Sequence, residues 1–310
     1  MSCKALQGRR LVWHLRRMET RKNKQGRTCK AIKAISMTAA MLCSVAAAMR
    51  PCCATQLTKQ TAQAFDQYIR TKEARDDREL AAKRDFLWID GLPPTEKAKE
   101  YAELKQGQIL AQRSDDCNTQ SCMSIPGGLI HDWIGIVFVP GISIPQALAV
   151  LQDYGHDAEY YRPEVVKAKL LVKSGDEYRV YLRLKQVDMI TVVLDTEYDI
   201  RYTRIDSEHV YSRSYSTRVA EVDHAGAKEE RDEPVGNDHG FLWRLYSYWR
   251  FYEADGGVYI QCDAVSLTRD VPTGLGWLIG SFIEKIPAES LRSTLTETRA
   301  ALLQKLAPVK

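Results

Sequence analysis

The stretch that decides the fold is residues 241–269, which read FLWRLYSYWRFYEADGGVYIQCDAVSLTR. Apolar and polar side chains alternate along residues 241–253 and again along 257–269, with the period of two that is typical of β-strands. The Gly-rich turn at 253–257 predicts that the two strands form a hairpin. One face of the first strand carries Phe, Trp, Leu and Ser, and the other carries Arg and Tyr.

We expect the two faces of this strand to have different surroundings. Arginine is rarely buried without a partner, so the face of Arg244, Tyr246, Tyr248 and Arg250 is expected to look outward. The opposite face is then expected to point toward the core.

A helix is predicted after the hairpin. Residues 272–274 break the sheet, residues 275–286 form an apolar connection, and Pro287 suits the first turn of a helix. The helix has a mostly apolar stripe made of Leu291, Leu295, Thr298, Leu302 and Leu306. A long hairpin followed by a terminal amphipathic helix predicts a sheet that folds over that helix.

Further strands are predicted before the hairpin. Ser143 suits the N-cap of an intervening helix, a helical turn follows at residues 158–161, and a charged loop spans residues 223–239. Short turns connect regularly spaced strand candidates, which favours one antiparallel sheet over βαβ units. These candidates are residues 106–113, 128–139, 165–172, 177–185, 190–201 and 210–222.

The first 54 residues differ in composition from the rest. They contain 12 Lys/Arg and one acidic residue, which gives them a net charge of +11. The whole chain has a formal net charge of +4, so residues 55–310 carry −7. A basic segment, the uncharged run Ile35–Met49 and small residues after it predict a secretory signal peptide over residues 1–54. Initiation at Met18 would shorten the basic segment. An uncleaved anchor is the alternative, but an apolar run of about 15 residues is shorter than the roughly 20 that span a bilayer.

We therefore expect export to the periplasm or the medium, with cleavage between Met49 and Thr55. Residues 55–105 are polar and helical in pattern, and Gly91-Leu92-Pro93-Pro94 separates two helical pieces. This predicts a helical arm packed on the main domain of residues 106–310. A partly disordered linker over residues 70–84 is the alternative.

Cys117 and Cys122 lie in a loop between two predicted strands. In an exported protein such a pair predicts a disulfide, with free thiols as the alternative. A metal site has less support, because no second Cys or His pair lies nearby. Cys262 is expected to be a buried free thiol on the inner face of its strand.

Two passages resemble one known family. The first runs from Val139-Pro140-Gly141-Ile142-Ser143 through residues 147–154 to Tyr161-Arg162-Pro163-Glu164-Val165. The second runs from Pro272 through Trp277-Leu278-Ile279 to Leu303. Their order and spacing resemble the START-like (SRPBCC) superfamily, which includes lipid-transfer START domains, birch-allergen-like proteins, polyketide cyclases/dehydrases and coenzyme Q-binding proteins.

The resemblance covers about residues 106–306 and implies an α+β helix-grip fold. In this fold a curved antiparallel sheet wraps around a long C-terminal helix, here with a helical N-terminal arm added. It also implies an apolar cavity that binds a lipid, isoprenoid, quinone, sterol or polyketide-like molecule. It does not imply catalysis, because most members are carriers.

The predicted ligand-binding residues come from the core-facing strand positions and from the terminal segment. Small side chains among them would leave volume for a ligand, although plain core packing is the alternative. They are Trp243, Leu245, Ser247, Trp249, Ile260, Cys262, Ala264, Ser214, Ser216, Trp277, Leu278, Leu291 and Leu295.

No catalytic residue, cofactor or metal site is predicted. No His stands at metal-ligand spacing to another His or to a Cys. His239 is borne on a loop and is more simply solvated than functional. Asp195, Glu197 and Asp199 share one strand face, which we interpret as a solvated face rather than an acid/base pair.

The preferred function is an exported carrier of a hydrophobic small molecule. A cyclase/dehydrase-type enzyme acting on such a molecule is one alternative, and a filled-core structural domain is another. Nucleic acid is not an expected partner, because residues 55–310 are acidic and phosphate binding needs a basic surface. Transient contact with a membrane is compatible with the carrier function.

Overall fold

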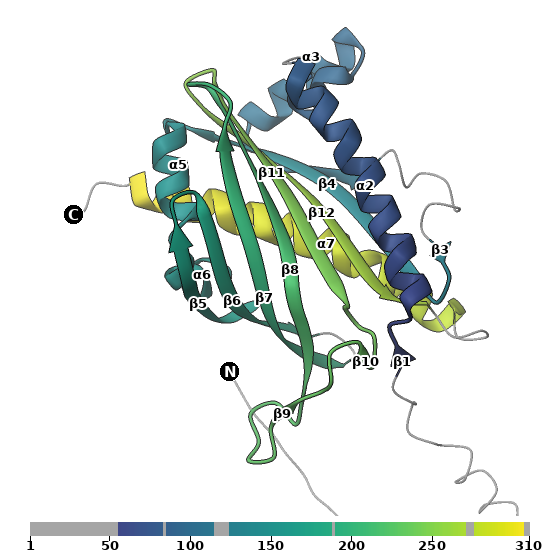
Figure 1. Cartoon of the computed structure of the whole chain (residues 1–310). Helices are drawn as coiled ribbons and strands as arrows, with labels where there is room; N and C mark the ends of the chain where they lie inside the picture. The colour runs from purple at the N-terminus through teal and green to yellow at the C-terminus, as the bar shows by residue number, and fades with distance from the viewer. Residues whose placement is uncertain (1–54, 83–84, 115–123, 188–189, 271–275, 307–310) are drawn as a thin grey trace, which may run out of the picture. The chain divides into compact units, whose positions relative to one another are not determined.

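The structure is a computed structural model that describes residues 55–82, 85–114, 124–187, 190–270 and 276–306, with the backbone alone for 55, 124, 276–284 and 306 (Figure 1). The predicted signal peptide and the predicted Cys117–Cys122 disulfide lie outside the described residues. Both therefore stay predictions.

A curved antiparallel sheet forms the centre of the described chain, in the order β2-β4-β12-β11-β8-β7-β6-β5. The strands are β2 (Leu110–Arg113), β4 (Gly128–Pro140), β5 (Val165–Ser174), β6 (Glu177–Val187), β7 (Thr191–Arg204), β8 (His209–Asp223), β11 (Arg244–Ala254) and β12 (Gly257–Arg269). Short strands β3 (Ser124–Ile125) and β9 (Arg231–Asp232) add to β4 and β8, while β1 (Thr55–Gln56) pairs with β10 (Asn237–Asp238). All these pairings are antiparallel, which confirms the expected sheet type.

The β11–β12 hairpin has the predicted turn. Ala254 pairs with Gly257, and the two residues between them, Asp255 and Gly256, have φ angles of 55° and 75°. Two successive positive φ angles define the type I′ turn, which matches the twist of a hairpin. Gly256 adopts this conformation without the steric cost that a side chain would add.

Helices cover both faces of the sheet. The arm comprises α2 (Lys59–Ala82), the 3-10 helix η1 (Trp88–Gly91) and α3 (Pro94–Lys105), so residues 70–82 are helical. The others are α5 (Ile144–Leu151), η3 (Tyr154–His156), α6 (Asp157–Tyr160) and α7 (Gly276–Leu306). Figure 1 shows α7 passing behind the strands and α2 in front of β4 and β12. None of the described helices is both long and apolar enough to cross a membrane.

Helix α7 begins earlier than the sequence pattern predicts. It starts at Gly276, and Pro287 lies inside it rather than in its first turn. A proline removes one backbone hydrogen bond, at a cost of about 3 kcal/mol in a helix interior. Residues 276–286, which were expected to form an apolar connection, are instead the first turns of α7, and the helix continues through Pro287 despite this cost.

The strand alternation gives the sheet two faces, which we name by what covers them. The inner face packs on α5 and α7 and carries Ile260, Cys262 and Phe251. The arm face lies opposite and packs on α2, η1 and α3, through Tyr248 and Val265 near α2 and through Tyr259 near η1 and α3. A sheet that curls around a C-terminal helix is the predicted α+β helix-grip fold, with the helical arm added.

The Arg/Tyr side of β11 lies on the arm face, away from α7 as predicted, but it does not face solvent. Arg250 is 7% exposed. Its Nη2 donates to Asp76 Oδ1 at 3.2 Å and to Glu79 Oε2 at 3.0 Å, and its Nη1 donates to the Phe86 carbonyl at 2.9 Å. The outward prediction is therefore wrong, because the arm supplies the carboxylates that allow an arginine to be buried.

A lysine from the arm is buried in the same interface. Lys72 is 1% exposed, and its Nζ lies 2.5 Å from Asp263 Oδ2 and 3.6 Å from Asp132 Oδ2. Tyr68 donates to Asp132 Oδ2 at 2.6 Å. Burial by itself lowers the pKa of Lys72, but Asp263 and Asp132 more than offset it and raise the pKa. Burial, reinforced by Asp263, raises the pKa of Asp132.

Candidate functional site

Helix α7 lies close to β4 because Gly135 has no side chain. A Cβ at this position would lie 2.7 Å from Leu295 Cδ1 and 3.1 Å from the Leu110 carbonyl oxygen. Arg292 donates to the carbonyls of Ile109 and Ala111 at 3.1 and 3.0 Å. These contacts hold α7 against the β2–β4 edge of the sheet.

One end of the inner face is completely filled. Val137, Val139 and Ile260 have no exposed surface there, and they pack with Ala147 of α5 and Leu302 of α7. Toward the other end of β4, the contacts move back along α7, from Arg299 at Phe138 to Leu295 at Gly135. This progression places the earlier turns of α7 over the remaining part of the inner face.

That remaining part is less tightly filled. Leu245, Ser247, Trp249, Ala264 and Trp133 are each only partly buried, although all lie on the inward side of their strands. Apolar side chains that keep accessible surface beneath a covering helix are what a ligand-binding groove requires. We name these five residues the inner strip.

The structure brings most of the predicted ligand-binding residues together. Ile260, Cys262, Leu291 and Leu295 are buried in the inner-face core, and Cys262 is a free thiol as predicted. Trp249 and Ala264 pack against the edge of this core.

Two further predicted residues, Ser214 and Ser216, are buried on β8. Ser216 Oγ accepts a hydrogen bond from the Leu245 amide at 3.0 Å, which ties it to the backbone. The side chains of Trp277 and Leu278 lie outside the described part of the chain.

Trp243 is the predicted residue that the structure moves elsewhere. It precedes β11, which begins at Arg244, so the strand alternation does not extend to it. Its side chain packs with Phe65 of α2 on the arm face, and Nε1 donates to Asp238 Oδ1 at 3.0 Å. Its assignment to the cavity is therefore wrong.

A buried polar cluster lies at the α6 end of the inner face, and the sequence reasoning missed it. The hydroxyls of Tyr154 and Tyr202 are 2.8 Å apart, and those of Tyr161 and Thr298 are 3.1 Å apart. Asp157 is buried beside them, and burial, reinforced by Asp153, raises its pKa to about 8. Tyr202 and Thr298 are distant in sequence from Tyr154, Asp157 and Tyr161. The only sequence signal for the cluster was therefore the helical spacing of residues 157 and 161.

The acidic strand face does not converge on a catalytic pair, but the expectation that it is solvated is wrong for Asp195, which is 7% exposed. Asp195 accepts from Arg183 Nε and Nη2, both at 2.7 Å, and from Tyr181 OH at 2.6 Å. Burial opposes ionisation of Asp195, but these donors more than offset it and lower its pKa. Asp199 forms an exposed pair with Arg179. Across the described residues, no group of three His, Cys, Asp or Glu could hold a metal ion.

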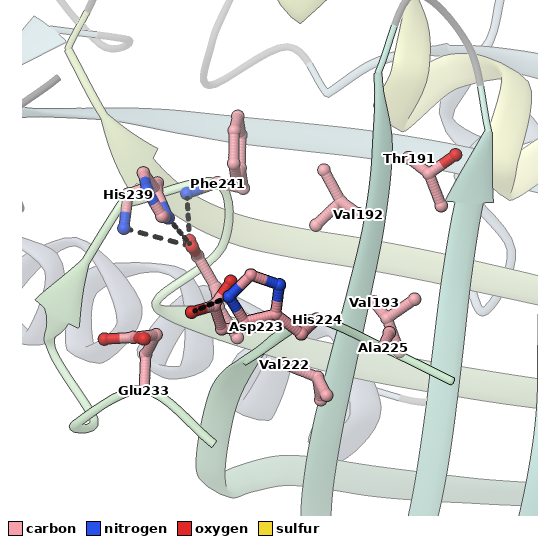
Figure 2. Close-up of a pocket in the computed structure, with 11 residues that line it drawn as sticks. Thr191, Val192, Val193, Val222, Asp223, His224, Ala225, Glu233, His239 and Phe241 are labelled. Carbon is pink, nitrogen blue, oxygen red and sulfur yellow. Dashed lines mark hydrogen bonds and ion pairs between the residues drawn. The ribbon is translucent and has the colours of Figure 1, made fainter. Parts of the chain in front are cut away.

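A separate hollow of about 290 Å³ lies where β8 ends beside the segment that leads into β11 (Figure 2). Glu221, itself buried, accepts from the His239 amide at 3.0 Å, from His239 Nδ1 at 2.8 Å and from the Phe241 amide at 2.9 Å. Three donors from residues 239–241 meet on one carboxylate, so Glu221 fastens this segment to β8. His239 keeps about half of its side chain exposed.

Comparisons with known proteins find only distant structural similarity, at low identity and low TM-score. No protein-family model matches the chain, and no curated protein sequence matches it. The structure is similar to a STAR-related lipid transfer protein from Xanthomonas axonopodis, at 16% identity and a TM-score of 0.41, covering 58% of this chain and 96% of that one. Human STARD10 gives 9% identity and a TM-score of 0.38, covering 69% and 81% of the two chains.

Zhui aromatase/cyclase from Streptomyces sp. R1128 gives 13% identity and a TM-score of 0.35, covering 58% of this chain and 97% of that one. The fold of this chain is START-like on its own sheet order and its own gripping helix. At these identities no ligand or activity passes from those proteins to this one.

Proposed function

We propose that the protein is a carrier that holds a hydrophobic small molecule between the inner strip and the first turns of α7. The inner strip carries this proposal: five apolar or small side chains on the inward side of the sheet remain only partly buried. A lipid, isoprenoid, quinone or polyketide-like molecule fits the chemistry of this lining.

Enlarging one side chain of the inner strip tests the carrier function. In a groove, Ala264→Phe should abolish binding of a fluorescent fatty acid or quinone analogue and leave the unfolding temperature nearly unchanged. In a filled core the same change overpacks and costs about 1–3 kcal/mol. Ala227→Phe, on an exposed turn, is the matched control for adding a phenyl ring.

Early unfolding of Ala264→Phe together with no probe binding by the wild type would show that the domain is a packed structural module. Mass spectrometry of lipids that co-purify with the wild type identifies the ligand. Loss of that lipid from Ala264→Phe, and its retention by Ala227→Phe, would place it at the inner strip.

An enzyme of the cyclase type is the second candidate, and the Asp157 cluster favours it. A carboxyl whose pKa lies at about 8 can donate a proton at neutral pH, and three tyrosine hydroxyls lie around it. Asp157→Asn separates the two functions. A carrier would keep its ligand unchanged in this variant, whereas an enzyme would stop converting the co-purified molecule.

We also propose that the protein acts after export and makes transient contact with a membrane. The basic and then apolar composition of residues 1–54 supports export. N-terminal sequencing of the exported protein should find a start between Met49 and Thr55. An intact Met1 or Met18 terminus in a membrane fraction would contradict it.

A further inference from the structure

Exposed apolar side chains gather at one edge of the sheet. Among the large hydrophobic residues of the described chain that are exposed, four lie on β5 at 37–53% exposure: Val166, Leu170, Leu171 and Val172. Val187 and Ile190 add to them at the neighbouring β6–β7 connection. Val235 and Phe241 are the exposed members found elsewhere. A concentration of this kind marks an interaction surface.

The two edges of the sheet are treated differently. At the β2 edge, Arg292 of α7 donates to the Ile109 and Ala111 carbonyls and so covers the strand. Strand β5 forms the other edge: among the described strands it pairs with β6 alone, and the short helices η3 and α6 lie close to it. An edge strand that keeps exposed aliphatic side chains is a place where a partner can dock.

The charge on β5 indicates what kind of partner would dock there. The strand carries Lys167, Lys169 and Lys173 and no acidic residue, although residues 55–310 as a whole carry −7. All three lysines are exposed, and none forms an ion pair with a described residue. Lysines interleaved with aliphatic side chains complement a bilayer surface that contains anionic lipid.

The geometry of β5 argues against a second strand as the occupant. The β5–β6 ladder shifts register between Val165 and Lys167 and again between Leu170 and Val172. Such bulges interrupt the regular edge that strand addition needs. Two copies of β5 paired across a two-fold axis would also bring their lysines together, which opposes self-association.

We propose that β5, with the exposed side chains of Val187 and Ile190, is a membrane-docking edge selective for anionic lipid. This proposal rests on the proposed carrier function. Docking through β5 would place the carrier at the bilayer surface, where an apolar ligand enters or leaves the membrane. Each lysine is expected to contribute about fivefold in partitioning to an anionic surface.

Hydrogen–deuterium exchange of the full chain tests this surface directly. It measures amide protection in β5 itself, so membrane binding by residues 1–54 does not confuse the result. Vesicles of phosphatidylcholine in which about a third of the lipid is anionic phosphatidylglycerol should protect the β5 amides from exchange. Vesicles of pure phosphatidylcholine should not protect them. The β2 edge, already covered by Arg292, should show no change.

Two variants and a control complete the experiment. The triple variant Lys167→Gln, Lys169→Gln, Lys173→Gln should weaken β5 protection about a hundredfold in lipid concentration, and Leu171→Ser with Val172→Ser should weaken it at unchanged charge. Val235→Ser, at a site that is 50% exposed and outside β5, should have no effect on β5 protection.

Vesicle binding without β5 protection would overturn the proposal, as would protection that is equal on neutral and anionic vesicles. Concentration-dependent β5 protection without lipid would show strand pairing between copies instead. Probe binding measured on the same variants separates this outcome from failure of the carrier function: the lysine variants should bind the apolar probe normally.

Discussion

The two faces of one sheet both bury apolar side chains, but only the arm face also buries ion pairs beneath its helices. On the inner face, α7 buries apolar side chains such as Leu295 against Ile260. On the arm face, α2 buries Lys72 beside Asp263, and Asp76 beside Arg250. The comparison teaches that a charged strand face is no guarantee of solvent, because a second helix can bring the opposite charges.

The arm-face charges depend on one another for their burial. Glu73 accepts hydrogen bonds from the hydroxyls of Tyr215 at 2.6 Å and Tyr248 at 2.9 Å, one turn of α2 from Asp76 and Asp77. Glu73, Asp76, Asp77 and Glu79 of α2 each accept from a donor on β8 or β11. The arm is therefore fixed in register by polar contacts, which are directional, whereas α7 is fixed mainly by shape.

The largest expected effect is on the arm face. Lys72→Met should lower the free energy of unfolding by about 3–5 kcal/mol, because it leaves two buried carboxyl groups without their cation. Urea unfolding followed by tryptophan fluorescence measures it. A loss below about 1 kcal/mol would show that water solvates these carboxylates and that the arm is not docked.

The next effect sharpens the contrast on the inner face. Leu295→Ala should cost about 2–5 kcal/mol through lost burial and a cavity beside Gly135. This loss should be insensitive to salt, since no charge is involved. The partly buried Leu303 on the same helix is the matched site, and Leu303→Ala should cost clearly less. Equal losses would show that the core at Leu295 is not close-packed.

A smaller effect concerns pH. The pKa of Asp157 is raised to about 8 in the folded protein, above a value near 4 in an unfolded chain. The folded state therefore binds this proton more tightly, and the stabilisation it gives is lost as the pH rises from about 4 to about 8.

Asp157→Asn should remove this dependence and so gain about 2–4 kcal/mol relative to wild type between pH 5 and pH 8. Unfolding curves at the two pH values measure it. A relative stability that does not change with pH would mean that the Asp157 carboxyl is ionised in the folded protein.

The smallest effect is expected at an exposed ion pair of the arm, which contrasts with the buried pair of Lys72. Lys97 Nζ lies 2.8 Å from Asp90 Oδ1, with more than a third of the lysine side chain exposed. Lys97→Met should change stability by less than about 1 kcal/mol, and high salt should remove the difference. A cost that matches Lys72→Met would mean that burial does not decide the strength of these pairs.

Local patterns were sufficient for the elements of the fold. Alternation predicted β11 and β12, and the Asp255-Gly256 turn predicted their pairing. The start of α7 could not be predicted, since Pro287 is as compatible with a helix start as with a helix interior that packing sustains. Trp243 was assigned to the wrong face, because alternation is informative only as far as the strand extends.

For the candidate site, the sequence determined the amphipathic strands, the apolar stripe of α7 and the set of small residues on β8 and β11. Each follows from spacing along a regular element, which side-chain geometry fixes locally. Only the tertiary structure decided that Arg250 is buried, that Asp157 lies near Tyr202, and which strand forms an edge with exposed apolar side chains. These depend on contacts between residues far apart in the chain, so the burial that sets their charges and pKa values is not encoded at any one position.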